Sequence, residues 1–312
     1  MINTDVKISG GGYVAEFRSD LGGNCYRLYH EPSGSEILRT PSSDEELFSQ
    51  VYLFGNPILF PPNRISGASF EFEGRRYEFP LNEPSTGCHI HGELYKKKFS
   101  VKEKSGDSVC FFYEAKSGEY IGFPHAFRLE RSYKASLSGL EEEIKVVNLS
   151  GEDMPFMLAF HTTFNVPFAN GSSGEEAYLE CPVGKEHIRN EKFLPTLEYV
   201  GGRARENELS DGTYRIYSSS LSAFYESEGN TALVADRENG GCIVYEASEE
   251  YKYRMLWRKD GAKFVVIEPQ TAAIDCFHLE APAEEKGLIA IAPGESVTLK
   301  TRFAYKSLEK HN

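Results

Sequence analysis

The feature that most constrains the fold of this chain is an alternation of apolar and polar side chains with a period of two residues. Successive side chains of a β-strand point to opposite faces, so this period indicates strands that bury one face. Turn-forming Gly, Ser and Asn residues separate the alternating runs at short intervals. The clearest runs are rich in β-branched and aromatic residues and cover 109–114, 127–137, 140–147, 242–247 and 251–257. They predict an all-β protein, built as an antiparallel sandwich or barrel.

Helical periodicity is almost missing from the sequence. Residues 43–48 (SDEELF) form the best candidate for a short helical turn, with Ser43 as its N-cap. The chain of 312 residues is long for one domain, but β-sandwiches often exceed 200 residues as a single unit. Since no linker, internal repeat or charge block interrupts it, we expect residues 1–312 to form a single domain.

Composition excludes several classes of function. The 47 acidic residues outnumber the 34 basic ones, and no segment combines clustered Lys or Arg with aromatic residues, so we expect no nucleic-acid binding. A small phosphorylated ligand stays possible, because one or two Arg residues can hold it. No apolar run approaches the ~20 residues that span a bilayer. We therefore expect no membrane contact and a cytoplasmic location, with the six widely spaced cysteines as free thiols.

Two segments carry residues suited to proton transfer. His161 follows an apolar run within 154–168 (MPFMLAFHTTFNVPF), where it is either a hydrogen-bonded core residue or a proton carrier. Glu268 ends a Phe-Val-Val-Ile run and directly precedes Pro269. A carboxylate at the end of a buried strand is uncommon, so Glu268 either points into a cleft or forms a buried salt bridge. Gln270 follows as a ligand-binding or strand-capping residue.

Two further segments carry possible binding residues. Asn63 and Arg64 come after two prolines in 60–65 (FPPNRI), and the Arg fork suits vicinal hydroxyls or a carboxylate unless it is simply a surface residue. His89 and His91 lie two apart in 87–92 (GCHIHG), so on a strand they would share one face. A metal pair is conceivable there, but no further ligand spacing accompanies it, and we predict no metal site.

Taken in order, these segments resemble the aldose 1-epimerase family over nearly the whole chain. The matching residues are Asn-Arg-Ile at 63–65, His-Gly at 91–92, Pro-Phe-x-x-x-x-His-x-x-Phe-Asn at 155–165, and the late Glu at 268. The resemblance implies a large two-sheet β-sandwich with a central sugar cleft. It also implies a mutarotase that interconverts the α and β anomers of a free hexose without a cofactor.

In that comparison Glu268 is the base on the anomeric hydroxyl and His161 is the acid on the ring oxygen. The substrate-binding residues implied are Asn63, Arg64, His91, Gln270 and, with less support, His89. The chain departs from the family pattern at Glu93 and Leu197, where Gly is usual, and its 218–224 stretch lacks the family's substrate-binding Asp. The sugar therefore need not be galactose.

Three alternatives stay open at this point. A hexose 6-phosphate mutarotase would keep the acid/base pair and add a second basic residue at the cleft, which the sequence does not locate. A sugar-binding protein without catalysis would not need a matched acid and base. A glycosidase would require two opposed carboxylates, whereas only Glu268 stands out.

Overall fold

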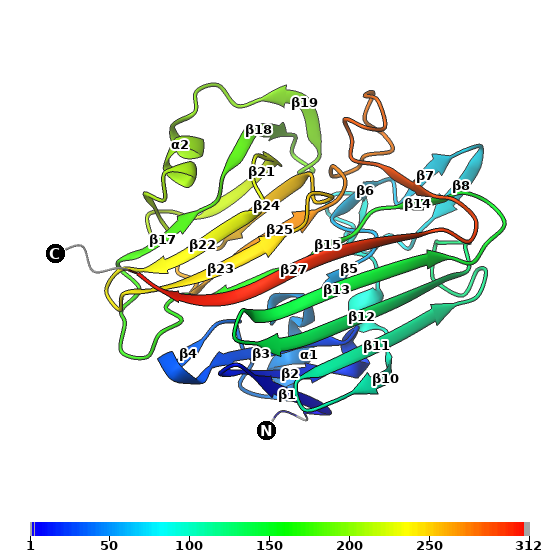
Figure 1. The fold of residues 1–312 in the computed structure, drawn as a ribbon. Coiled ribbons are helices and arrows are strands. Elements are labelled where there is room, and N and C mark those ends of the chain that lie inside the picture. The colour runs from blue at the N-terminus through cyan, green and yellow to red at the C-terminus, as the bar shows by residue number, and fades with distance from the viewer. Residues whose placement is uncertain (1, 3, 309–312) are drawn as a thin grey trace.

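Two large antiparallel sheets dominate the computed structural model, which describes residue 2 and residues 4–308 (Figure 1). The first sheet has nine strands, and the long strand β27 links its two halves. In spatial order the strands are β10 (Ser100–Lys104), β11 (Ser108–Ala115), β12 (Phe127–Ser136), β13 (Gly139–Asn148), β27 (Ser296–Ser307), β23 (Gly241–Ala247), β22 (Thr231–Asp236), β17 (Ala177–Glu180) and β20 (Tyr214–Arg215).

The second sheet has eight strands and carries the residues that the sequence marks for chemistry. Its order is β19 (Pro195–Tyr199), β18 (Val183–Arg189), β21 (Leu221–Ser227), β24 (Tyr253–Arg258), β25 (Phe264–Gln270), β15 (Ala159–Phe160) and β5 (Ile58–Leu59), with β16 (Thr162–Asn165) also paired to β25. All seven residues of β25 are buried, and the strand is central, with β24 paired along one edge and β15 and β16 along the other.

Smaller elements surround the two sheets. A four-stranded sheet near the N-terminus comprises β1 (Val6–Gly10), β2 (Tyr13–Arg18), β3 (Asn24–His30) and β4 (Ser35–Glu36). Three strand pairs are β6 (Arg64–Ser66) with β9 (Cys88–Ile90), β7 (Ser69–Phe72) with β8 (Arg75–Glu78), and β14 (Met154–Phe156) with β26 (Ile289–Ile291). The helices are α1 (Asp44–Ser49), α2 (Ala204–Ser210) and the 3₁₀ turns η1 (Ser19–Leu21), η2 (Glu31–Ser33), η3 (Val51–Leu53) and η4 (Leu94–Lys96).

The predicted all-β sandwich is confirmed. Buried and more exposed residues alternate along β12 and β13, as the two-residue period requires. Between the sheets, the Phe164 ring of β16 lies 5.3 Å from the Tyr245 ring of β23 and 6.1 Å from the Phe303 ring of β27. Such aromatic contacts bury large apolar areas and hold the two sheets face to face.

The one helical turn that the sequence predicts is also present. It forms α1, and the Ser43 hydroxyl accepts a hydrogen bond from the Glu46 amide at 3.2 Å, which satisfies a donor that the first helical turn leaves free. All six cysteines are free thiols, as expected.

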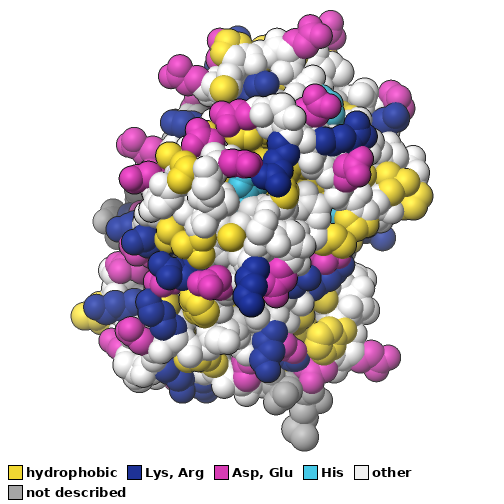
Figure 2. All heavy atoms as spheres, turned by 90° about the vertical axis from the view of Figure 1, so that its right-hand side faces the viewer, with side chains coloured by type: hydrophobic (Ala, Val, Ile, Leu, Met, Phe, Trp, Pro, Cys, Tyr) yellow, Lys and Arg dark blue, Asp and Glu magenta, His cyan; other side chains and the backbone are white. Residues whose placement is uncertain are grey.

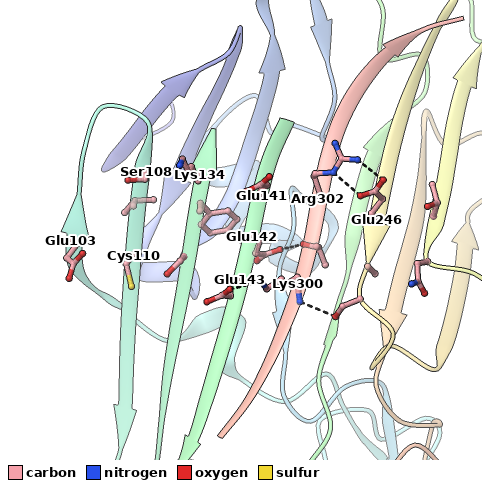
Figure 3. Close-up of a pocket in the computed structure, with 18 residues that line it drawn as sticks. Glu103, Ser108, Cys110, Lys134, Glu141, Glu142, Glu143, Glu246, Lys300 and Arg302 are labelled. Atoms are coloured by element: carbon pink, nitrogen blue, oxygen red, sulfur yellow. Dashed lines mark hydrogen bonds and ion pairs between the residues drawn. The ribbon is translucent and has the colours of Figure 1, made fainter. Parts of the chain in front are cut away.

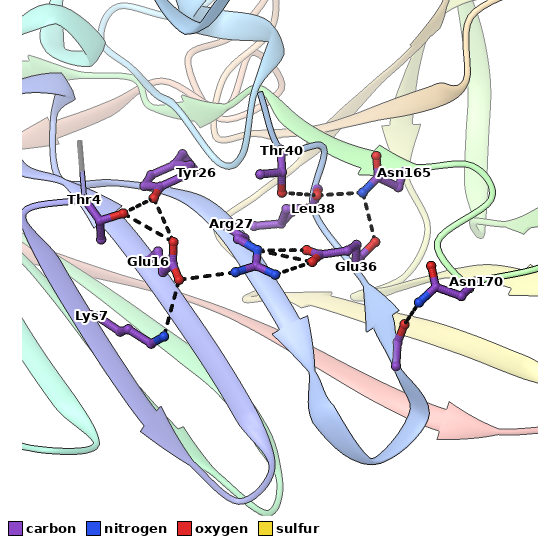
Figure 4. Close-up of polar contacts among 11 residues, drawn as sticks. Thr4, Lys7, Glu16, Tyr26, Arg27, Glu36, Leu38, Thr40, Asn165 and Asn170 are labelled. Carbon is purple, nitrogen blue, oxygen red and sulfur yellow. Dashed lines mark hydrogen bonds and ion pairs between the residues drawn. The ribbon is translucent and has the colours of Figure 1, made fainter. Parts of the chain in front are cut away.

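The N-terminal sheet is tied to the strand that follows His161. Arg27 forms ion pairs with Glu16 and Glu36, and the Asn165 side chain of β16 donates to the carbonyls of Glu36 and Leu38 at 3.0 and 2.8 Å (Figure 4). Because these bonds hold β16 on the side opposite to β25, they fix the backbone immediately after His161.

A second anchor is a buried ion pair between the two sheets. Arg131 and Glu142 lie 2.7 Å apart with almost no exposure, and both hydrogen-bond Asn56. The Asn56 side chain in turn accepts from the Thr162 hydroxyl at 2.6 Å. Every polar atom in such a buried group needs a partner, so the network sets the position of the backbone on both sides of His161.

The surface and the helices give two further observations. On the face shown in Figure 2, acidic and basic side chains are interspersed rather than separated into large patches of one sign. Within residue 2 and residues 4–308, no helix has the length and hydrophobicity needed to cross a membrane.

Candidate active site

The candidate site is a cavity of about 490 Å³ where β24 and β25 meet the loops around β6, β9 and η3. Glu268 and His161 both line it, and both are more than nine-tenths buried. His161 Nε2 lies 3.6 Å from Glu268 Oε1. Two residues more than a hundred positions apart in sequence therefore meet as a histidine–carboxylate pair.

Strand geometry explains how the pair is held. Glu268 is in register with Met255 of β24 and lies near the end of β25, just before Pro269. His161 lies between β15 and β16, and its backbone amide donates to the Pro57 carbonyl at 3.0 Å. These backbone contacts fix the positions from which the two side chains enter the cavity.

Burial shifts the pKa of both members of the pair, in opposite directions. Loss of hydration raises the pKa of Glu268 to about 8, although a hydrogen bond from Gln270 and the charges of Arg64 and Arg189 oppose that rise. Loss of hydration also lowers the pKa of His161 to about 4. Both shifts disfavour the charged form, so at neutral pH the Glu268 carboxyl group is protonated and the His161 imidazole is neutral.

His91 occupies the cavity because the chain turns sharply after β9. Its φ angle is 67°, and its backbone amide donates to the Asn63 carbonyl at 2.9 Å. The next residue, Gly92, also has a positive φ, and a Cβ there would lie 1.8 Å from the Phe60 carbonyl oxygen. Only glycine permits this close approach, which places the His91 ring 5.5 Å from the His161 ring. Burial keeps the pKa of His91 well below its ordinary value, so the ring is neutral.

The prediction that His89 and His91 share one face is wrong. His89 lies on β9, packs against Phe79 and donates from Nδ1 to the Pro80 carbonyl at 2.7 Å. The strand ends at Ile90 and His91 adopts a left-handed conformation, so the two-residue alternation does not extend to it. His89 is therefore a core residue outside the cavity.

Asn63 and Arg64 both line the cavity, but neither side chain is free of internal contacts. The Asn63 side chain accepts from the Arg64 amide at 3.0 Å. The Arg64 guanidinium donates to both carboxylate oxygens of Glu83 at 2.7 and 2.8 Å. This fork-to-fork contact orients Arg64 and neutralises most of its charge.

Gln270 contacts the candidate base rather than the cavity. It is fully buried, and its Nε2 donates to Glu268 Oε2 at 3.2 Å. Gln270 does not line the cavity, and its contact with a ligand stays a prediction. Its place in the site is to orient the carboxyl group of Glu268.

The lining residues that the sequence did not mark include Tyr52, Lys96, Arg189 and Trp257. The Tyr52 ring lies 5.5 Å from that of His161, edge to face, and Trp257 lies 6.4 Å from His161 on another side. Trp257 could have been chosen from the sequence as a candidate site residue, because it is the only tryptophan and ends a predicted strand. Nothing local marks the other three, because they reach the cavity only through the packing of η3, η4 and β18.

No metal centre is apparent in the part of the chain that the structure describes: no three His, Cys, Asp or Glu side chains are grouped to hold an ion. A larger groove of about 710 Å³ crosses β10–β13, β27 and β23 (Figure 3). It contains no histidine, and its Lys300 and Arg302 are paired with Glu143 and Glu246. The cavity around Glu268 is thus the better candidate for acid/base chemistry.

The fold and the cavity together define a β-sandwich protein with a buried histidine–carboxylate pair in a polar and aromatic pocket. Residues 6–304 match the aldose 1-epimerase family, and the chain belongs to that family.

Individual relatives agree with the family assignment. A galactose mutarotase-like protein from Clostridium acetobutylicum has a similar structure, with a TM-score of 0.91, 28% identity and 99% of each chain covered. A structure described as a putative aldose 1-epimerase from Escherichia coli K12 has a TM-score of 0.80 at 22% identity, with 97% of this chain and 98% of that chain covered. The uncharacterized protein YphB of Escherichia coli K12 is 23% identical over 249 residues, which are 78% of this chain and 80% of YphB.

Proposed function

We propose that this protein interconverts the α and β anomers of an aldose, with His161 and Glu268 as the acid/base pair. The observation that carries the proposal is the 3.6 Å approach of His161 Nε2 to Glu268 Oε1 at the wall of a buried cavity. A free hexose is the substrate expected from the sequence.

Anomer exchange needs one proton removed and one delivered. A base takes the proton of the C1 hydroxyl, the bond from C1 to the ring oxygen breaks, and an acid protonates the ring oxygen. The open-chain aldehyde then turns about the bond between C1 and C2 and recloses by the reverse steps. Each positioned proton transfer contributes about 10²–10⁴ in rate.

The proposed roles are Glu268 as base and His161 as acid. Burial favours a protonated Glu268 and a neutral His161, whereas ring opening in this direction starts from the Glu268 carboxylate and the His161 imidazolium. The two forms contain the same number of protons and differ by one transfer across the 3.6 Å gap. Hydroxyl groups of a bound sugar donate hydrogen bonds to the carboxylate, and such bonds favour its charged form.

The surrounding residues fit a pyranose ring. His91 and Arg64 face the same cavity as the pair and can donate hydrogen bonds to ring hydroxyls, with Asn63 in support. Tyr52 and Trp257 offer aromatic surfaces to the apolar C–H faces of the sugar.

A glycosidase has less support. The second carboxylate that lines the cavity is Glu83, and it is occupied by Arg64 and by the Thr86 hydroxyl. Burial favours a higher pKa for Glu83, but the hydrogen bonds from Arg64 and Thr86 lower it on balance. Glu83 is therefore held as a paired anion and does not offer the free acid or nucleophile that glycoside cleavage needs.

Polarimetry tests the proposal. Crystalline α-D-glucose and α-D-galactose are dissolved in separate samples, and the approach to anomeric equilibrium is followed with wild type, His161→Asn and Glu268→Gln. Acceleration by wild type that both variants lose supports the proposal. An unaccelerated approach to equilibrium with every aldose tried, neutral or charged, refutes it and favours a sugar-binding protein without catalysis.

A further inference from the structure

The cavity around Glu268 differs in charge from the rest of the molecule. The whole chain carries a formal charge of −13, yet three cationic side chains line this cavity, those of Arg64, Lys96 and Arg189. The acidic side chains that line it are Glu83, already paired with Arg64, and Glu268, which burial keeps protonated at neutral pH. The pocket of an acidic protein is thus locally positive.

Within the described part of the chain, Arg189 has no carboxylate in ion-pair contact, and the same holds for Lys96, whose ammonium lies over the Tyr95 ring. Arg189 ends β18, and its Nη2 donates to the Ser222 carbonyl and hydroxyl of the neighbouring strand β21 at 2.5 and 3.0 Å. Its Nη1 lies 3.7 Å from the Met255 sulfur, a weak acceptor. Among the described residues, no carboxylate oxygen comes within 4.0 Å of the Arg189 guanidinium. The bonds to Ser222 fix the group in place without neutralising it.

The surroundings make this free charge costly. Burial and, after it, the nearby positive charge of Arg64 lower the pKa of Arg189 on balance, although the charges of Glu186 and Glu268 oppose that shift. A guanidinium stays protonated in proteins, so the penalty persists until an anion compensates for it. In the groove across the nine-stranded sheet, by contrast, Lys300 and Arg302 already have carboxylate partners (Figure 3).

We propose that the aldose this protein binds carries an anionic substituent, a phosphate, sulfonate or carboxylate away from C1, and that Arg189 binds it. This inference rests on the proposed function and names its substrate class. A guanidinium offers only donors, in a fork that matches the oxygen atoms of such groups. Arg64 and Lys96 line the same cavity and add to the positive potential. The sugar ring would then lie between Arg189 and the pair of His161 and Glu268.

Trp257 provides a direct binding signal, because it is the only tryptophan and it lines the cavity. Its fluorescence is titrated with D-glucose, D-glucuronate, D-glucose 6-phosphate and 6-deoxy-6-sulfo-D-glucose, and anomer exchange is measured with the same sugars. We expect at least one anionic sugar to bind about 10- to 100-fold more tightly than glucose, the range of one to two charge-assisted hydrogen bonds. Raising the salt from 50 to 500 mM should weaken that binding but not the binding of glucose.

Variants separate a charge site from a merely structural role. Arg189→Gln should remove most of the preference for the anionic sugar by raising its KM, and leave kcat and the binding of glucose within about two-fold. Arg189→Lys should restore part of the preference, since it keeps the charge but loses the fork. Arg76→Gln is the control, because Arg76 is an exposed residue that is paired with Glu78 and does not line the cavity. It should match wild type.

The outcomes distinguish the two proposals. Equal affinity for glucose and for all three anionic sugars, or an Arg189→Gln variant that weakens both classes equally, overturns the anion site while mutarotation stands. Tight, salt-sensitive binding of an anionic sugar that depends on Arg189, without accelerated anomer exchange, supports the anion site and refutes the mutarotase function alone.

Discussion

Replacing Glu268 by Gln should make the protein more stable at neutral pH while it abolishes catalysis. The wild-type carboxyl group is nearly fully buried, and its pKa rises from an ordinary value of 4.5 to about 8. In the unfolded chain the group ionises above 4.5, so between pH 4.5 and 8 folding requires the uptake of a proton. Stability present below pH 4.5 is therefore lost progressively as the pH rises toward 8.

The magnitude follows from the size of the shift. Each unit of pH between the two pKa values costs about 1.4 kcal/mol, so the penalty is about 3 kcal/mol at pH 7 and under about 1 kcal/mol at pH 5. Glutamine has nearly the same shape and no charge in either state. Glu268→Gln should thus exceed wild type in the free energy of unfolding by up to about 3 kcal/mol at pH 7, and the advantage should shrink toward pH 5.

Urea denaturation of both proteins at pH 5, 6, 7 and 8 measures this difference. His161 titrates in both proteins, so its contribution largely cancels. Glu198→Gln, which replaces an exposed carboxylate on β19, is the matched control. A stability difference for Glu268→Gln that does not change with pH, or a variant less stable than wild type at pH 7, would refute the argument that burial holds the proton on Glu268.

Three further outcomes follow from the same contacts. The plot of kcat/KM against pH should be bell-shaped, because activity needs one shared proton on the acid/base pair. The value of kcat/KM should fall below about pH 4, where the pair takes up a second proton, and above about pH 8, where it loses the first. A kcat/KM that keeps rising above pH 9 contradicts this prediction. Gly92→Ala should raise KM and lower stability, because the new Cβ overlaps the Phe60 carbonyl and displaces His91, whereas Gly74→Ala, with open space around it, should leave KM unchanged. Glu142→Gln should lower the free energy of unfolding by about 3–5 kcal/mol, because it leaves Arg131 as an unpaired buried charge. Urea denaturation measures this loss. A loss under about 1 kcal/mol would argue against a stabilising role for the Arg131–Glu142 ion pair.

The two-residue alternation was sufficient to predict the sandwich, because each strand buries one face and the buried residues are therefore every second residue in the sequence. Strands β12 and β13 match their predicted runs to within a residue or two at each end. The small sheets were not predicted, since β4 and β6 have only two and three residues and show no period. That residues 1–312 form a single domain stays a prediction.

The site was predictable only where the residue type itself carries information. Glu268 is conspicuous as a carboxylate in an apolar strand, and the structure places it beside His161. Arg189 is not conspicuous, because its approach to the cavity depends on the pairing of β18 with β21, a long-range contact with no local signature. The prediction that His89 shares a face with His91 failed for a related reason. The sequence does not reveal that β9 ends one residue before His91.

The most direct test of the central claim is anomer exchange at equilibrium, measured by two-dimensional exchange NMR of the C1 proton signals. The sugar is whichever aldose binds best by Trp257 fluorescence. We expect wild type to speed exchange between the α and β signals, and His161→Asn and Glu268→Gln each to reduce kcat by about 10²–10⁴. If either variant exchanges the anomers at the wild-type rate while folded and able to bind the sugar, the pair is not the catalytic acid and base.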